Sequence, residues 1–190
     1  MGAKDHRESS EKEGFARCAI LTVTDTKTRD NDTSGQAAFE IFQKFGHTVV
    51  AHKIVPNHRK KIASAAEGAL KEADLLVTIG GTGASRKDIS VESVRPLIEK
   101  ELPGFGEMFR AMSVKEIGTA AMMSRAVLGI TSKGKIVLSL PGSENAVRLG
   151  LEGILMGELK HLLWEVTNAM AKEVQGVCAI TCFLRAWKNF

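Results

Sequence analysis

The sequence predicts an α/β fold in which helices cover a mainly parallel sheet. Three short apolar runs with strand character, Ala16–Thr24, His47–Val55 and Leu75–Ile79, alternate with two segments of helical periodicity. The turns between these segments are short, and such strand–helix–strand units form right-handed crossovers between parallel strands. Leu75–Ile79 is apolar at nearly every position, which is typical of a strand buried on both faces.

The first strand and the first helix have recognisable limits. Ala16–Thr24 (ARCAILTVT) is the first predicted strand, and the polar loop TKTRDNDTSG follows it. Asp32 or Thr33 can cap the next helix, because either side chain can accept a hydrogen bond from a first-turn amide. Gly46 ends this helix. Its apolar residues recur at helical spacing and are Ala38, Ile41, Phe42 and Phe45.

The same alternation continues through the middle of the chain. His47–Val55 is the second predicted strand, and the turn Pro56-Asn57-His58 leads into an amphipathic helix. The third strand, Leu75–Ile79, ends at a glycine-rich loop, and a helix is predicted over Val91–Lys100. The apolar residues of the amphipathic helix are Ile62, Ala65, Ala66, Ala69 and Leu70.

The second half predicts two more helices and two more strands. After the turn Leu102-Pro103-Gly104, the segment GFGEMFRAMSVKEIG carries an apolar stripe that we interpret as core. Ala126–Ile130 and Lys135–Leu140 are predicted strands joined by a turn at Ser132-Lys133-Gly134. A long helix is predicted from Pro141 to about Met170. The apolar stripe consists of Phe105, Met108, Phe109 and Met112.

These elements predict one domain over residues 16–170. Residues 1–15 are charged and polar, and we expect a mobile arm there. Residues 171–190 form a C-terminal extension for which two roles stay open: an additional helix, or contact with another subunit.

Composition narrows the class of protein. The net charge of +4 is mild and the ten aromatic residues do not interleave with a basic stripe, so a nucleic-acid-binding module is not favoured. Three cysteines make no disulfide framework, and neither cysteines nor histidines have the spacing of a structural zinc site. No apolar run is long enough to span a membrane, and the N-terminus is too polar for a signal peptide. We therefore expect a cytoplasmic protein.

The stretch from Ala73 to Glu92 has the strongest functional character. Its third strand ends in Gly80-Gly81-Thr82-Gly83, where missing side chains allow positive φ and close approach of a ligand. Successive amides in such a turn can form a nest for an anion. Arg86, Lys87 and Asp88 follow, so the loop suits a phosphate and a metal ion. The alternative reading is a tight strand-to-helix turn with solvated charges.

Two well-known phosphate loops do not fit this stretch. The P-loop requires a Lys-Ser or Lys-Thr pair after its glycines, and none follows this strand. The dinucleotide-binding fingerprint requires a third glycine where Arg86 stands. The loop therefore belongs to a different class of site.

Three predicted strands end in polar or small-residue loops. These loops are Gly80–Gly83 after Ile79, Pro141–Asn145 after Leu140, and the segment that begins at Thr24-Asp25. In an open parallel sheet all three emerge at the carboxyl edge, where ligands bind. Their convergence favours a phosphorylated ligand.

Several ordered motifs together resemble the molybdopterin-binding family of molybdenum cofactor biosynthesis, specifically its MoaB/MogA branch. The resemblance covers about residues 17–166. Four sequence segments, PGFGEMFR, EIGTA, SRAV and LPGS, are more similar to MoaB than to MogA. The matching residues are Thr24-Asp25, Asp32–Gly35, Ile79–Gly83 with Asp88, Pro103–Glu107, Ser124–Ala126, and Leu140–Ser143 with Ala146.

The resemblance implies a three-layer α/β/α fold and assembly as a trimer or a hexamer. It also implies binding of molybdopterin, a pterin that carries a dithiolene and a terminal phosphate. MogA-like members adenylylate this phosphate with Mg-ATP and release pyrophosphate, so the implied activity is that of an adenylyltransferase. Other proteins of cofactor assembly are possible partners, and whether the pathway uses molybdenum or tungsten stays open.

The same resemblance assigns roles to individual residues. Asp88 would be catalytic and would hold Mg²⁺, a hard cation that prefers carboxylate oxygens. Glu107 and Arg125 would either bind substrate or buttress the site, and Arg86 and Lys87 would neutralise ATP charge or form a solvated face. The residues implied to bind substrate are Asp25, Ser34, Gly80, Gly81, Thr82, Gly83, Glu107, Ser124, Arg125, Pro141, Gly142 and Ser143.

Two departures from the family pattern bear on activity. Asn57 stands where active adenylyltransferases carry an aspartate, and an amide coordinates a cation more weakly than a carboxylate and cannot act as a base. Ser90-Val91-Glu92 replaces the usual Thr-Pro-Glu but keeps the glutamate. Two hypotheses therefore compete: an adenylyltransferase with Asn57 in its catalytic site, and a non-catalytic molybdopterin carrier.

Overall fold

A six-stranded sheet with the strand order β2-β1-β3-β6-β5-β4 forms the centre of the molecule. The computed structural model describes residues 15–168. The expected N-terminal arm, apart from Phe15, and the 171–190 extension lie outside the described residues. Over the described part of the chain, no helix is long and apolar enough to cross a bilayer.

Four of the six strands are parallel, as the strand–helix alternation predicts. These strands are β1 (Arg17–Val23), β2 (Thr48–Val55), β3 (Leu75–Ile79) and β6 (Ile136–Leu140). The remaining two, β5 (Val127–Ile130) and β4 (Lys100–Glu101), extend the sheet in an antiparallel manner beyond β6. A short turn between β5 and β6, with Gly134 at φ +66°, makes these two strands a hairpin.

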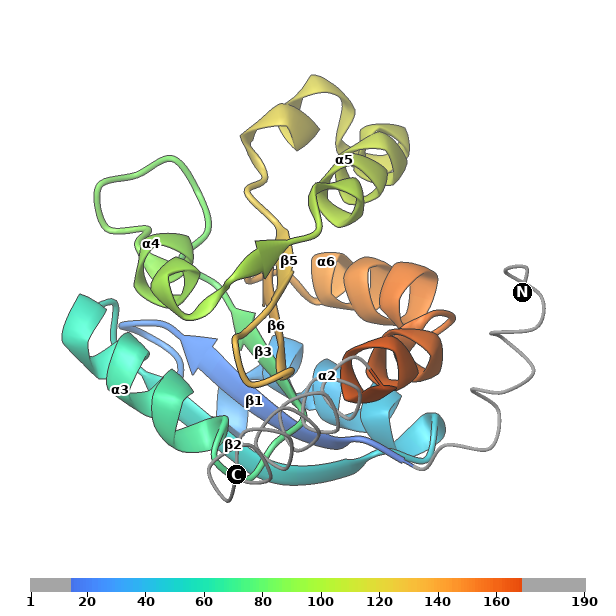
Figure 1. Cartoon of the computed structure of the whole chain (residues 1–190). Helices are drawn as coiled ribbons and strands as arrows, with labels where there is room; N and C mark the ends of the chain where they lie inside the picture. The colour runs from blue at the N-terminus through green and yellow to red at the C-terminus, as the bar shows by residue number, and fades with distance from the viewer. Residues whose placement is uncertain (1–14, 169–190) are drawn as a thin grey trace, which may run out of the picture.

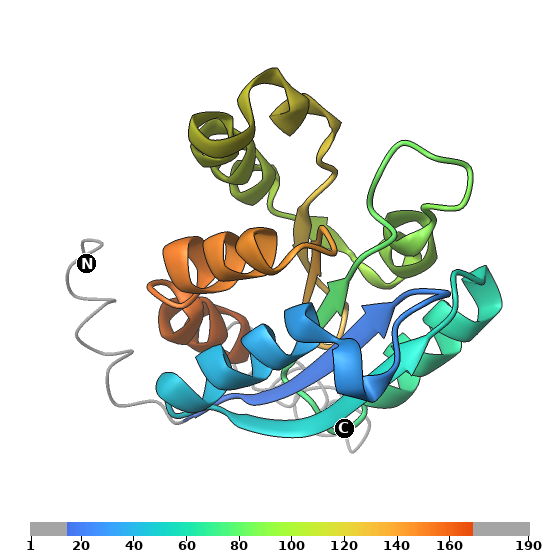
Figure 2. The ribbon, with the colours of Figure 1, turned by 180° about the vertical axis from the view of Figure 1, so that it is seen from behind.

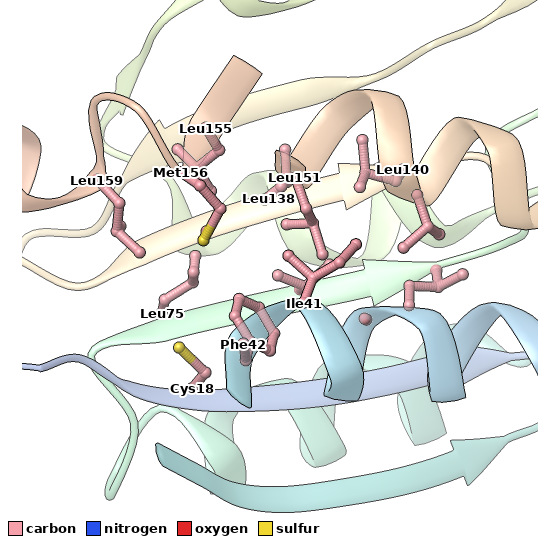
Figure 3. Close-up of a cluster of buried hydrophobic side chains, with 14 of the residues drawn as sticks. Cys18, Ile41, Phe42, Leu75, Leu138, Leu140, Leu151, Leu155, Met156 and Leu159 are labelled. Carbon is pink, nitrogen blue, oxygen red and sulfur yellow. The ribbon is translucent and has the colours of Figure 1, made fainter. Parts of the chain in front are cut away.

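Helices cover both faces of the sheet, which gives the three-layer α/β/α architecture (Figures 1 and 2). One face is covered by α2 (Thr33–Lys44), α5 (Pro103–Ile117) and α6 (Glu144–Arg148), and the other by α3 (Arg59–Ala69) and α4 (Ser90–Val94). Figure 3 shows the larger core, where Ile41 and Phe42 of α2 lie against Leu75 and Leu138 of the sheet. Complete burial of such side chains contributes roughly 1.5–3 kcal/mol each.

The limits of α2 follow the sequence signals closely. Asp32 is its N-cap, since the Asp32 side chain accepts a hydrogen bond from the Gly35 amide. This observation selects Asp32 over Thr33, the alternative that the sequence left open. Gly46, with φ +80°, follows the last turn, as expected for a residue that ends a helix.

The helix predicted over Val91–Lys100 is shorter than expected. Helix α4 ends at Val94, a 3₁₀ turn follows over Arg95–Leu97, and Lys100–Glu101 forms the edge strand β4. Pro96 explains the early end, because proline has no amide hydrogen to continue the α-helical ladder.

The apolar stripe on α5 is only partly core. Phe105 and Phe109 are buried and stack on each other, whereas Met108 is 54% exposed and Met112 is half-buried. Helix α5 meets the domain along one narrow face, and residues four apart lie on that face while Met108 points away from it. The prediction is therefore wrong for Met108.

The long helix predicted from Pro141 to Met170 is interrupted. Helix α6 ends at Arg148, a π-helix spans Leu149–Leu155, and residues 159–168 are again helical after a turn. The Met156 amide donates to the Leu151 carbonyl, five residues back, at 2.8 Å. Leu151 and Leu155, both within the π-helix, are buried in the core.

Candidate functional site

The two small-residue loops emerge at the same rim of the sheet. Strands β3 and β6 are adjacent and parallel, and their last residues, Ile79 and Leu140, are register partners. The Gly80 amide donates to the Leu140 carbonyl at 2.9 Å. The convergence of the strand ends that the sequence predicts is therefore confirmed.

A cavity of about 730 Å³ lies at this rim. Its walls come from the end of β1, the loop after β3, the loop after β6, the start of α2 and the outer part of α5. Both views place the loop after β3 and helix α5 at the same end of the sheet (Figures 1 and 2). The expected site residues that line the cavity are Ser34, Gly80, Gly81, Thr82, Gly83, Asp88, Ser124, Pro141, Gly142 and Ser143.

The glycine loop needs glycine at its first two positions. Gly80 and Gly81 have φ of +94° and +64°, a region that residues with a Cβ rarely adopt. A Cβ on Gly80 would lie 2.5 Å from the Val23 carbonyl oxygen, and one on Gly81 would lie 2.3 Å from Ser90 Oγ. The loop is thus packed tightly against β1 on one side and α4 on the other.

The loop exposes fewer amides than expected. The Gly80 N–H is already used by the Leu140 carbonyl, so the expectation of a four-amide cradle is wrong for Gly80. In the part of the chain that the structure describes, the amides of Gly81, Thr82 and Gly83 donate to no protein acceptor. These three amides are available to an anion in the cavity.

Arg125 holds the glycine loop in place from behind. Its Nε donates to the Thr82 carbonyl and its Nη2 to the Asp88 carbonyl, both at 2.9 Å, and its guanidinium also pairs with Glu92. The hydrogen bonds from Arg125 hold the pKa of Glu92 below its ordinary value. Because Arg125 does not line the main cavity, the geometry favours the buttressing role over direct substrate binding.

Lys27 is a cavity residue that the sequence analysis missed. Its Nζ donates to Ser34 Oγ at 2.8 Å and lies 3.5 Å from the Gly142 carbonyl oxygen, so it joins two walls of the cavity. The available signal was its position four residues beyond the end of β1. The same loop contains three aspartates and an arginine, so the sequence offered no reason to select Lys27 among its charged residues.

Asp32 anchors the wall on which Lys27 lies. Its carboxylate is completely buried and accepts hydrogen bonds from Thr22 Oγ1 at 2.6 Å and from Ser34 Oγ at 3.1 Å, and His52 Nε2 lies 3.2 Å away. Burial raises the pKa of Asp32, but these bonds and the Gly35 amide outweigh that effect, so the pKa lies below its ordinary value. Asp32 is therefore ionised at neutral pH, and it orients Ser34 toward Lys27.

Comparison with known proteins matches this arrangement to one family. The family described as "Probable molybdopterin binding domain" matches residues 19–161, which is most of the chain. The chain belongs to this molybdopterin-binding family.

The chain is similar both to MoaB proteins and to a Mog protein of the molybdopterin-binding family. Molybdenum cofactor biosynthesis protein B of Bacillus cereus is 40% identical over 169 residues, which make up 87% of this chain and 98% of the relative. The crystal structure of the tungsten cofactor synthesizing protein MoaB from Pyrococcus furiosus is 40% identical with a TM-score of 0.75, over 81% of this chain and 98% of that one. The molybdopterin biosynthesis Mog protein from Mycobacterium ulcerans is 26% identical with a TM-score of 0.72, over 82% and 99%. The resemblance to MoaB is thus confirmed.

Six residues that the molybdopterin-binding resemblance implicates lie outside the cavity lining, and two of them, Arg86 and Lys87, are exposed. Arg125 braces the loop, and Glu107 is exposed on α5. Asp25 is also exposed, and its Oδ1 accepts a hydrogen bond from the backbone N–H of Asn57 at 2.9 Å. Asn57 lies beside the loop, with its Oδ1 only 2.7 Å from where a Cβ on Gly81 would be.

Asn57 also has an unusual side-chain environment. Its Oδ1 is buried and, within residues 15–168, has no hydrogen-bond partner, and the same is true of Ser90 Oγ on the other side of Gly81. An unpartnered buried oxygen costs roughly 1–3 kcal/mol, so this position is either functional or filled by a bound species.

The donor set of the cavity fits magnesium only together with substrate. Over residues 15–168, no group of three or more Asp, Glu, His or Cys side chains is placed to hold a metal ion. Asp88 is a carboxylate in the cavity lining, and it folds back over Gly83, with Oδ2 accepting from the Ser85 amide at 3.2 Å. Glu116 and Glu144 also line the cavity. Mg²⁺ typically binds through one or two carboxylates plus substrate phosphates, so a site that includes Asp88 is compatible with it.

Proposed function

We propose that this protein binds molybdopterin in the cavity of about 730 Å³ and transfers the adenylyl group of Mg-ATP to it. Membership of the molybdopterin-binding family assigns the chain a role in molybdenum cofactor biosynthesis. The observation that supports the proposed adenylyl transfer is that the loop after β3 and the loop after β6 meet at one rim of the sheet. Their meeting brings the cation of Lys27 and the carboxylate of Asp88 to a single cavity.

In the proposed reaction, the terminal phosphate of molybdopterin attacks the α-phosphorus of ATP. One phosphorus–oxygen bond forms, the bond between the α- and β-phosphates breaks, and pyrophosphate leaves. Phosphoryl-type transfers of this kind depend on positioning and on neutralising charge more than on covalent catalysis. The residues of the cavity are suited to that task.

Lys27 and the three free amides would hold the anionic groups. The Lys27 ammonium is half-buried, where a charge-assisted hydrogen bond is about twice as strong as a neutral one. The amides of Gly81, Thr82 and Gly83 are held rigidly because Arg125 fixes the Thr82 carbonyl behind them. Asp88 would bind Mg²⁺, which when bound neutralises negative charge that develops on the phosphates.

A second candidate function is a molybdopterin carrier without catalysis. Asn57 favours it, because an amide beside Gly81 replaces the carboxylate that active relatives are expected to carry. The two functions share the cavity and differ only in turnover.

One assay separates these functions. Purified protein is incubated with molybdopterin and Mg-ATP, and both adenylylated pterin and pyrophosphate are quantified. Product far in excess of protein supports the transferase. Tight pterin binding, with no pyrophosphate released over the same period, supports the carrier.

A pair of asparagine variants sharpens the result. Asn57→Asp restores a carboxylate next to Gly81, and if that group is a missing metal ligand, pyrophosphate release should rise. Asn145→Asp adds the same charge to another wall of the cavity and is the matched control, because it should not increase the rate. Equal effects of the two variants would refute a specific role for position 57.

We also propose that the protein forms a trimer or a hexamer. Five large apolar side chains on α5 and the following 3₁₀ turn are at least half exposed, an unusual cost for a monomer. Light scattering with size-exclusion chromatography gives the mass directly, and a monomer would contradict this proposal. The side chains are Met108, Val114, Ile117, Met122 and Met123.

A further inference from the structure

A second cavity, of about 360 Å³, lies on the other side of Ser124 and Arg125 from the main one. Helix α5, the start of β5 and helix α4 contribute its walls. Nothing in the proposed adenylyl transfer uses this cavity. It includes Arg110 of the PGFGEMFR segment, for which the proposed reaction has no role.

The charges around this second cavity do not cancel. Arg125 pairs with Glu92, and Arg95 pairs with Glu101 at 3.0 Å. Arg110 is half-buried and has neither an ion pair nor a hydrogen bond with any residue of the described chain. The cavity is therefore lined by three arginines and two glutamates, and Arg110 is the cation left in excess.

Two further features make the region attractive to an anion. Ser124 lies between the two cavities and lines both, and its Oγ is buried without a hydrogen-bond partner in residues 15–168. Helix α5, fifteen residues long, begins at Pro103 beside the cavity with no side-chain cap, so the positive end of its dipole is uncompensated there. The Arg110 guanidinium folds back over this first turn, with Nη1 only 3.0 Å from where a Cβ on Gly106 would be.

We propose that this second cavity binds a tetrahedral oxyanion of the phosphate, sulfate or molybdate class. Arg110 supplies the charge, Ser124 Oγ supplies a neutral donor, and the start of α5 supplies a favourable dipole. Glycine at position 106 leaves room for this arrangement, because a Cβ there would lie 2.8 Å from the Ala126 carbonyl oxygen and 3.0 Å from Arg110 Nη1. The two cavities have Ser124 in common, but Arg110 and Gly106 line only the second one, and the proposal does not depend on whether the protein adenylylates molybdopterin.

The experiment must distinguish the two cavities, since both can attract phosphate. Backbone amide NMR signals do so: the Gly106 amide reports the second cavity and the Gly81 amide reports the main one. The ¹⁵N-labelled full chain is titrated with sodium phosphate, with sodium sulfate and with sodium molybdate. Sodium chloride at equal ionic strength gives the effect of screening alone.

Three variants complete the test. Arg110→Gln should raise the Kd of the anion, fitted from the Gly106 amide shift, by at least about fivefold. The Kd fitted from the Gly81 amide shift should stay unchanged. Arg95→Gln is the matched control, because Arg95 lines the same cavity but is already paired with Glu101. Lys27→Gln should raise the Kd fitted from the Gly81 amide shift and leave the Kd fitted from the Gly106 amide shift unchanged.

The outcomes are decisive in both directions. The proposed site is supported if the Gly106 amide shows a saturable shift that is lost in Arg110→Gln and kept in Arg95→Gln. The anion with the lowest Kd among phosphate, sulfate and molybdate then identifies the ligand. A shift that chloride reproduces, equal behaviour of the two arginine variants, or no shift at Gly106 with any anion would overturn it.

Discussion

Replacing Gly80 with alanine tests whether the tight packing of the glycine loop is required by the fold. Gly80 has φ +94°, and a new Cβ would lie 2.5 Å from the Val23 carbonyl oxygen, whereas real Cβ atoms stay beyond 3.0 Å. Backbone strain of this kind costs of order 1–3 kcal/mol, and overpacking against a fixed backbone atom costs about as much again. We therefore expect Gly80→Ala to lower the free energy of unfolding by about 2–6 kcal/mol.

Gly68 provides the matched control for this substitution. It lies in α3, and a Cβ there would have nothing within 4 Å. Alanine is favoured over glycine in a helix by roughly 0.5–1 kcal/mol, so Gly68→Ala should be slightly stabilising. The two variants make the same chemical change in opposite environments.

The assay is equilibrium unfolding in urea followed by circular dichroism. The midpoint should fall for Gly80→Ala and rise slightly for Gly68→Ala, with similar slopes if the unfolded state is unchanged. Where the Gly80 variant remains folded, its anion binding measured at the Gly81 amide should also weaken. A difference of less than about 1 kcal/mol between the two variants would refute the argument, because the loop could then relax without cost.

Three further predictions concern charged groups. Burial opposes ionisation of Asp74, but hydrogen bonds from Arg17 and Lys135 outweigh it and lower the pKa of Asp74 to about 2. Asp74→Asn should therefore cost about 1–2 kcal/mol at pH 7, a value discounted for partial exposure, and the difference should vanish in unfolding curves as the pH falls from about 4 toward 2. Burial, with the charge of Lys160, lowers the pKa of His47, whose Nδ1 accepts the Ala16 amide. The unfolded chain therefore binds protons more readily, and stability should fall as the pH drops below about 6.5, with a smaller drop in His47→Gln. Lys27→Gln should weaken molybdopterin binding about 10-fold or more in calorimetry and reduce its salt dependence, and an unchanged Kd would exclude Lys27 from the site.

Much of the fold could be predicted from local pattern. Each of the five longer strands reads as an apolar run, and the ends of α2 follow from Asp32 and Gly46, because capping and periodicity depend on residues close in the chain. Two of the expectations that were wrong concern tertiary packing, whereas the early end of α4 has a local cause in Pro96. The exposure of Met108 and the π-helix at Leu149–Leu155 depend on what a helix meets rather than on its own sequence.

Some residues of the candidate site can be recognised from local sequence, whereas others depend on contacts with distant parts of the chain. The glycines at positions 80, 81 and 83 and the loop after Leu140 are visible in the sequence, since missing side chains and small residues after an apolar run have a local meaning. Lys27 was missed because its importance depends on Gly142, 115 residues away along the chain. The role of Arg125 was left open for the same reason, because the Thr82 carbonyl that it binds is 43 residues distant.

The sequence alone therefore determined the five longer strands, the glycine loop and the family to which the chain belongs. The tertiary structure decided which strand ends meet, which amides remain free and which charges lack a partner. The physical reason is that residue periodicity reports the burial of one element at a time, whereas the pairing of β3 with β6 sets distances between segments about sixty residues apart.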